Sequence, residues 1–270
     1  MSRIDETFAR LKMEGKGGLI PFITAGDPDI ESTRELLIAL ARAGADIIEL
    51  GVPFSDPIAD GPVIQRASQR ALINGTGLTQ ILKLVSDVRK ELGVPIVIFS
   101  YLNPLLQYGL SLFGAQAALV GVDGVLLTDL PAGEAVGFAQ RLSTHSLDLI
   151  RLVAPTSTDE RLKIIAEGAS GFIYAVSRTG VTGKKTESGE EAERLVARVR
   201  KFSDLPVAVG FGISNADQVA DVWRYAEAAV VGSAIVAEIE RAGSKDVVQR
   251  VEEFVRSLEP GRMILNPARV

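Results

Sequence analysis

The segment ESTRELLIALARAGADIIELGVPFSDPIADGP, residues 31–62, contains a helix, a strand and a long loop in that order. The sequence Asp27-Pro28-Asp29 supplies a cap for a helix expected over Glu31–Ala43, and Gly44 ends it. The apolar run Ile47–Leu50 follows without in–out alternation, which is typical of a parallel strand covered on both faces. This order predicts an α/β fold with a parallel sheet.

Seven more apolar runs of the same kind alternate with helical segments along the chain. They are Leu19–Thr24, Ile96–Phe99, Gly124–Leu127, Asp148–Val153, Phe172–Ala175, Val207–Gly210 and Ala229–Val231. Two of the helices between them are expected over Leu78–Leu92 and Ser157–Glu167, each followed by glycine. Eight such strands, with no linker and no shift in composition, predict a single (β/α)8 TIM barrel that forms one catalytic domain over residues 1–270. A doubly wound open sheet is the alternative.

The composition is that of a soluble globular protein, with 47% hydrophobic and 23% charged residues among 270. The net charge of −5 is spread along the chain without a basic block, which argues against nucleic-acid binding. No apolar run approaches the ~20 residues that a membrane span needs. The first residues, MSRIDETFARLKMEG, lack the apolar stretch of a signal peptide, so a cytoplasmic location is expected.

The chain has no cysteine and one histidine, which restricts its chemistry. Disulfides, thiolate metal sites and cysteine nucleophiles are excluded. His145 is expected in a loop before the strand at Asp148–Val153, away from the strand ends that carry the active site of a barrel. Carboxylates, lysine, tyrosine or a metal remain for acid–base work.

An acid interrupts the second strand, in Ile47-Ile48-Glu49-Leu50-Gly51. Active sites of TIM barrels lie at the carboxyl ends of the strands, where Glu49 stands. Acids are seldom buried in apolar surroundings without a reason, and desolvation raises the pKa toward the range useful for proton transfer. Glu49 is therefore a candidate general acid–base, with a structural ion pair as the alternative.

The loop after this strand, Val52–Pro62, contains three prolines and two aspartates, Asp56 and Asp60. Long ordered loops at this rim tend to be functional, although either aspartate also suits a turn or a helix cap. Two acids beside Glu49 suggest a metal site as an alternative, but no histidine or second acidic cluster completes a shell. No metal is therefore expected.

Two glycine-containing turns follow the last two strands, in Gly210-Phe211-Gly212-Ile213-Ser214-Asn215 and in Gly232-Ser233-Ala234. Glycine lets the backbone approach an anion closely, and a helix N-terminus supplies unpaired N–H groups. Many barrels hold phosphate after strands seven and eight, so this pair predicts a phosphate site, with simple tight turns as the alternative. The polar loop 177–187 is long enough to close as a lid, where Arg178 and Lys184 either contact phosphate or are solvated.

Six segments together resemble the tryptophan synthase α subunit family. They are PFITAGDP (21–28), IELGVPFSDPIADGP (48–62), NPLLQYG (103–109), TDLP (128–131), SRTGVTG (177–183) and GFGIS (210–214). The resemblance runs in order from about Phe8 to about Val255, whereas Pro260–Val270 match nothing recognised.

The resemblance implies a lyase that splits indole-3-glycerol phosphate by retro-aldol cleavage into indole and glyceraldehyde 3-phosphate. Glu49 matches the acid that protonates indole C3 and takes the proton of the neighbouring hydroxyl as the C–C bond breaks. Asp60 matches the carboxylate that hydrogen-bonds the indole N–H and stabilises the positive charge developing there. Neither step needs a metal or an organic cofactor in this chain.

The resemblance also assigns residues to the pocket, the phosphate and the partner face. Those around the indole and glycerol are Phe22, Tyr101, Tyr174 and Phe211. Those on the phosphate are Gly183, Gly212, Gly232 and Ser233, and Thr182 at the tip of the lid contacts Asp60 on closure. The residues facing the partner are Asp56, Asn103 and Pro104.

The implied partner is a β subunit that holds pyridoxal phosphate in an α2β2 heterotetramer and converts the indole to L-tryptophan. Three positions affect the fit of the pocket. Phe172 stands where tyrosine is frequent, Ser100 stands where a bulkier residue is common, and either Leu152 or Val153 lines the floor.

Three alternatives remain. A free-standing lyase would share these motifs and release indole, and a docking protein would activate β without keeping a buried acid. A phosphoribosyl isomerase barrel would carry an aspartate at the ends of strands one and five. Those strands end here in Phe-Ile-Thr and Val-Ala-Pro, which disfavours the isomerase.

Overall fold

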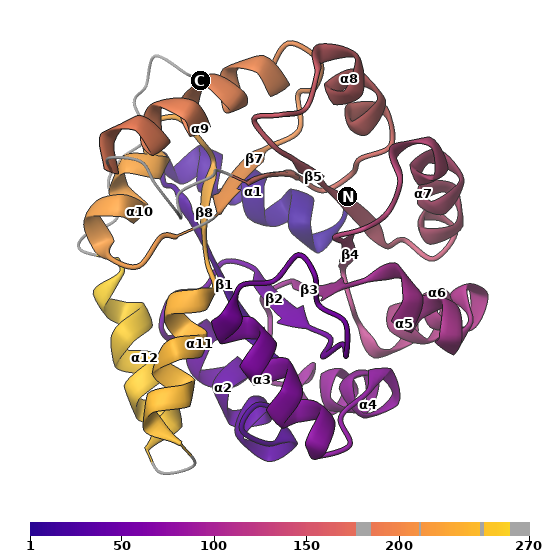
Figure 1. Cartoon of the computed structure of the whole chain (residues 1–270), viewed down its shortest axis with the longest axis vertical. Coiled ribbons are helices and arrows are strands. Elements are labelled where there is room, and N and C mark those ends of the chain that lie inside the picture. Colours follow the sequence, from indigo (N-terminus) through magenta and orange to yellow (C-terminus); the bar gives the residue numbers. More distant parts are fainter. Residues whose placement is uncertain (177–184, 211, 244–245, 260–270) are drawn as a thin grey trace.

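The computed structural model describes residues 1–176, 185–210, 212–243 and 246–259, and its strands form a closed parallel barrel (Figure 1). The strands are β1 (Gly18–Thr24), β2 (Ile48–Gly51), β3 (Ile96–Ser100), β4 (Gly124–Leu127), β5 (Asp148–Val153), β6 (Ile173–Val176), β7 (Val207–Gly210) and β8 (Ala228–Val231). Each pairs with the next, and β8 pairs with β1. The predicted (β/α)8 barrel is confirmed, and every strand lies within one residue of its expected bounds.

Helices surround the barrel on the outside and also cover one of its ends (Figure 1). They are α1 (Arg3–Glu14), α2 (Ile30–Arg42), α3 (Pro62–Ile73), α4 (Leu78–Val88), α5 (Leu102–Tyr108), α6 (Leu110–Val120), α7 (Ala135–Ser143), α8 (Asp159–Glu167), α9 (Lys185–Val199), α10 (Ala216–Trp223), α11 (Ser233–Ala242) and α12 (Val247–Ser257), with a 3-10 turn η1 (Ala132–Glu134) before α7. In the part of the chain that the structure describes, none of them is long and apolar enough to cross a membrane.

Side-chain hydrogen bonds set the ends of the expected helices. The Asp29 carboxylate accepts a hydrogen bond from the Ser32 N–H at 2.7 Å, so α2 starts at Ile30, one residue before the expected Glu31. The helix expected to reach Leu92 ends at Val88, because the Arg89 guanidinium donates to the carbonyls of the turn that follows. A Thr158 cap likewise starts α8 two residues later than expected.

The barrel interior is a separate apolar cluster. It contains alternate residues of the strands and three residues of α1: Ile4, Phe8, Leu11, Ile20, Ile47, Val97, Leu126, Ile150, Phe172, Ala208, Ala228 and Val230. Helix α1 thereby closes the amino-terminal end of the barrel, with the rings of Phe8 and Phe172 5.8 Å apart. The chemistry must therefore use the opposite end, where the strands finish.

Closure of the barrel also settles which residues of β5 face inward. Leu152 packs against the interior cluster, whereas Val153 belongs to the layer between strands and helices. Leu152 is therefore the floor residue, and Phe172 lies below it against α1. His145 lies in the loop between α7 and β5, as expected, and packs against Gly114 of α6.

Candidate active site

Glu49 is a buried carboxylate on β2, inside the barrel. It has the same orientation as Ile47 in the interior cluster, and it pairs with Phe22 of β1 and Val97 of β3. Its side chain is 0% exposed, and neither carboxylate oxygen has a hydrogen-bond partner among the described residues. Burial raises the pKa of Glu49 to about 8, in the direction that the sequence predicted. No lysine or arginine pairs with it there, so the structural ion pair is not formed among these residues.

Asp60 is partly buried in the loop between β2 and α3. Burial raises the pKa of Asp60 to about 6, although a hydrogen bond with Tyr101 acts in the opposite direction and lowers it. The Tyr101 hydroxyl also accepts a hydrogen bond from the Ala59 N–H at 2.9 Å, and the Phe54 ring lies 5.0 Å from the Tyr101 ring. Tyr101 thus anchors the loop that carries Asp60 to the end of β3.

Phe22 and Phe99 pack together at the carboxyl ends of β1 and β3, with centroids 5.2 Å apart and rings at 73°. A Cβ on Gly51 would lie 2.6 Å from Phe22 Cζ, so glycine is required for Phe22 to lie across β2. Phe99, which was not predicted from the sequence, takes the pocket position for which Ser100 was considered. Ser100 points away from the interior, and its hydroxyl donates to the Tyr101 carbonyl at 2.9 Å. Side chains alternate along a strand, so Phe99 faces the same way as the interior residue Val97, and this alternation could have identified it.

Tyr174 of β6 lies over Gly210 at the end of β7. A Cβ on Gly210 would fall 2.1 Å from the Tyr174 hydroxyl oxygen. Burial first, and then the charge of Glu49, raise the pKa of Tyr174 well above its usual value, so the phenol stays protonated. Leu152 pairs with Tyr174 in the sheet, and together they form the side of the barrel near Glu49.

The turn Gly232-Ser233 connects β8 directly to α11, and Ser233 is exposed there. The first hydrogen bond of α11 runs from the Val236 N–H to the Gly232 carbonyl, which leaves three backbone N–H groups directed out of the helix. Helix α10 differs, because Asn215 caps it by accepting from the Gln218 N–H at 3.0 Å. The open helix end after β8 is therefore the better anion site.

The turn Gly232-Ser233 is close to the aromatic residues at the strand ends. A Cβ on Gly232 would lie 3.5 Å from the Phe22 Cβ, and Phe22 is paired with Glu49. Gly212, after β7, is exposed with a φ of 72°, a conformation that favours glycine. The structure thus brings the predicted anion turn, aromatic residues and buried acid to one end of the barrel.

Other predicted site residues lie elsewhere or outside the described residues. Asp56 and Asn103 are exposed on the β2–α3 loop and on α5, and Pro104 is partly buried. Thr182, Gly183, Phe211, Arg178 and Lys184 lie outside the residues that the structure describes.

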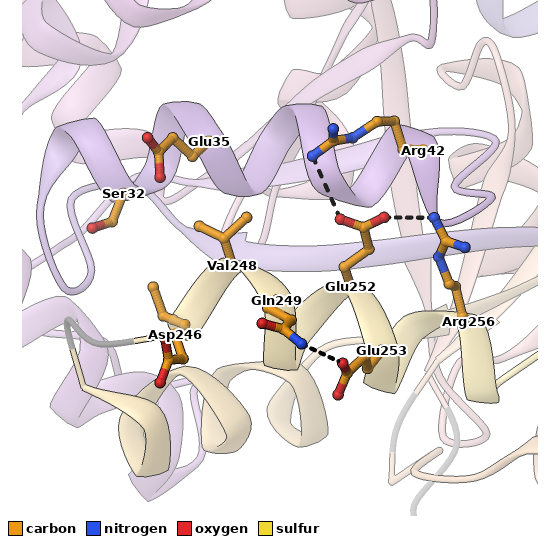
Figure 2. Close-up of a pocket in the computed structure, with 10 residues that line it drawn as sticks. Ser32, Glu35, Arg42, Asp246, Val248, Gln249, Glu252, Glu253 and Arg256 are labelled. Carbon is orange, nitrogen blue, oxygen red and sulfur yellow. Dashed lines mark hydrogen bonds and ion pairs between the residues drawn. The ribbon is translucent and has the colours of Figure 1, made fainter.

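A hollow of about 620 Å³ lies away from the barrel end, between α2 and α12 (Figure 2). It lies on the outer side of these two helices, where Glu252 bridges Arg42 at 3.5 Å and Arg256 at 2.6 Å. We therefore place the candidate active site at the strand ends and not in this hollow. Over residues 1–176, 185–210, 212–243 and 246–259, no group of three or more His, Asp or Glu side chains is arranged to hold a metal ion.

Comparisons with known proteins agree over nearly the whole chain. A family model described as tryptophan synthase alpha chain matches residues 8–263. The tryptophan synthase alpha chain of Acidiphilium cryptum is 53% identical over 237 residues, which are 87% of this chain and 86% of that protein. A crystal structure of tryptophan synthase subunit alpha from Legionella pneumophila has a TM-score of 0.89 at 40% identity, and the match covers 96% of this chain and 97% of that one. A crystal structure of tryptophan synthase from M. tuberculosis in an aminoacrylate-bound form has a TM-score of 0.87 at 35% identity. That match covers 97% of this chain and 100% of the M. tuberculosis chain.

Proposed function

Because the chain belongs to the tryptophan synthase alpha chain family, we propose that Glu49 and Asp60 carry out its reaction, the cleavage of indole-3-glycerol phosphate to indole and glyceraldehyde 3-phosphate. The enzyme is a carbon–carbon lyase of tryptophan biosynthesis. The observation that carries the residue assignment is the position of Glu49. It is a fully buried acid with no hydrogen-bond partner among the described residues, and it pairs with Phe22, which in turn lies against Gly232.

Glu49 acts first as an acid and then as a base. Its pKa of about 8 keeps it protonated at neutral pH, so it can donate a proton to indole C3. The Glu49 carboxylate then takes the proton of the hydroxyl on the adjacent carbon. The C–C bond breaks, its electrons return to the indole ring, and the hydroxyl carbon becomes the aldehyde. Glu49 ends the cycle protonated, so the proton balance closes without a cofactor.

Asp60 stabilises the intermediate. Protonation at C3 leaves positive charge on the indole nitrogen, and a carboxylate accepting a hydrogen bond from that N–H lowers its energy. The pKa of about 6 leaves Asp60 mostly ionised at neutral pH. Tyr101, which anchors the loop through Ala59, keeps this carboxylate in place.

The remaining residues bind and enclose the substrate. Ser233 and the backbone N–H groups of Gly232 and Gly212 hold the phosphate, and Phe22 and Tyr174 enclose the indole and glycerol, together with Phe99. Thr182, Gly183 and Phe211 complete the site by the family resemblance, and one catalytic domain spans residues 1–270. We infer no metal or organic cofactor in this chain.

The partner is a tryptophan synthase β subunit that contains pyridoxal phosphate, in an α2β2 heterotetramer to which indole passes. Two exposed residues, Asp56 and Asn103, support a docking face on the loop that carries Asp60 and on α5, with Pro104 beside them. The biosynthetic reaction and the cysteine-free sequence support a cytoplasmic location.

The test is indole release from indole-3-glycerol phosphate by the purified chain, alone and with a tryptophan synthase β subunit. For the partnered subunit we expect a slow rate that rises about ten-fold when β is added. This increase corresponds to a lowering of the activation barrier by about 1.4 kcal/mol. A fast rate that β does not change would favour the free-standing lyase, and no indole in either case would contradict the proposed function. In the same assay Glu238→Gln, at an α11 residue that forms an ion pair with Arg241 of the same helix, should match the wild type, whereas Glu49→Gln should release no measurable indole.

A further inference from the structure

The two ends of the proposed site are carried by two helices that lie side by side, α3 and α11 (Figure 1). Helix α3 begins at Pro62, two residues after Asp60, and α11 begins at Ser233. The first helix follows the carboxylate for the indole nitrogen, and the second presents the phosphate turn. Their relative position therefore sets the distance between the groups that bind the two ends of the substrate, if the proposed function holds.

An ion network joins these helices to each other and to the loop after β1. The Glu240 carboxylate of α11 accepts two hydrogen bonds from Arg66 of α3, both at 2.7 Å, and one from Arg70 at 2.8 Å. Arg70 also donates to both oxygens of Asp27 at 2.7 and 2.9 Å, and the Asp27 side chain is 1% exposed. Isolated surface ion pairs contribute little, but bidentate pairs joined in a network hold their geometry.

The apolar side of the same contact faces the strand ends. Ala67 of α3 and Val236 of α11 form a buried cluster with Phe22. Ala67 lies between Arg66 and Arg70 along α3, and Val236 lies one turn before Glu240. The charged and apolar contacts therefore belong to one interface, and its apolar edge reaches the residue that pairs with Glu49.

We propose that Glu240 is a positioning residue for the reaction, which holds α11 against α3 through Arg66 and Arg70 and so sets the span between the phosphate turn and Asp60. A ligand that occupies both ends depends on this span, because its second end binds at an effective concentration fixed by the geometry. A ligand that occupies only the phosphate turn does not depend on it. Loss of the network thus weakens two-ended ligands selectively.

A neighbouring acid provides a matched control. Glu238 lies two residues before Glu240 on the same helix, but its ion pair is with Arg241, within α11 itself. Glu238→Gln makes the same chemical change without touching the contact between helices. Arg66→Gln is a second test variant, since the Arg66 side chain is 50% exposed and its loss leaves the buried Asp27–Arg70 pair intact.

The experiment measures binding to the full chain by calorimetry with two probes. One is glycerol 3-phosphate, which has only the phosphate end, and the other is an uncleavable analogue with indole and phosphate joined by a saturated three-carbon chain. Glu240→Gln should weaken the analogue about five-fold and glycerol 3-phosphate less than about two-fold, with Arg66→Gln between wild type and Glu240→Gln. Glu238→Gln should change neither. Substrate kinetics should show the same selectivity, with KM raised and kcat lowered together.

Equal weakening of both probes by Glu240→Gln would overturn the proposal, because it would indicate a general loss of structure. Unchanged analogue binding, or the same loss in Glu238→Gln, would overturn it as well. Failure of the proposed function has a different signature, since the wild-type chain would then bind neither probe.

Discussion

Replacing Glu49 by glutamine should stabilise the fold while it removes activity. The pKa of this carboxyl rises from 4.5 to about 8 on folding because the barrel interior desolvates it. Because the folded-state pKa is raised, the folded protein is fully stabilised by neutral Glu49 below pH 4.5. As the pH rises through about 8 the carboxyl ionises in the folded state, and this stabilisation is lost. Glutamine keeps the shape and stays neutral, so the variant avoids the loss.

The magnitude follows from the size of the shift. At about 1.4 kcal/mol per pKa unit, the cost of burying ionised Glu49 reaches at most ~5 kcal/mol. Relaxation around the charge and entry of water at the open end of the barrel reduce it, so we expect the variant to be more stable by ~2 kcal/mol at pH 8. The advantage should nearly vanish at pH 5. Cleavage should fall by at least ~10²-fold, the usual contribution of a general acid–base.

Urea unfolding at pH 5, 6, 7, 8 and 9 measures this difference. Glu240→Gln is the reference, because ion pairing with Arg66 lowers the pKa of Glu240 to about 2 and its effect should be constant over this range. A stability difference between Glu49→Gln and wild type that does not grow between pH 5 and 8 would refute the raised pKa. A variant that keeps more than about a tenth of the rate would refute the acid–base role.

Further predictions concern the loop, the phosphate turn and the strand ends. Tyr101→Phe removes the hydrogen bond that lowers the pKa of Asp60, so the acidic limb of the kcat/KM–pH profile should move above about pH 6; an unmoved limb would assign it to another group. Ser233→Ala should raise KM by ~3–10-fold with kcat nearly unchanged, because it removes one hydrogen bond to the phosphate. An unchanged KM in steady-state kinetics would indicate that the phosphate binds elsewhere. Gly210→Ala places a Cβ 2.1 Å from the Tyr174 hydroxyl and should cost ~1–3 kcal/mol in urea unfolding, part of which Tyr174→Phe should restore; no recovery in the double variant would locate the strain elsewhere.

Local patterns in the sequence were sufficient for the barrel and for the candidate acid Glu49, whereas only the family resemblance distinguished Asp60 from Asp56. Buried runs such as Ile47–Leu50 mark strands because parallel strands are apolar on both faces, and eight of them in alternation with helices favour closure. Glu49 was identifiable because an acid within such a run is costly. The turn Gly232-Ser233 was identifiable from its order in the chain, after the last strand.

The tertiary structure alone decided which side chains meet. The inward orientation of Leu152 and Phe99, rather than Val153 and Ser100, depends on the register of each strand with its neighbours, and a shift of one residue reverses every side chain. The network that joins Arg70 to Asp27 and Glu240 connects residues 43 and 170 positions apart in the chain. A charged residue on a helix has the same local pattern whether it faces solvent or a neighbouring helix, and only closure of the barrel brings these groups within hydrogen-bond distance.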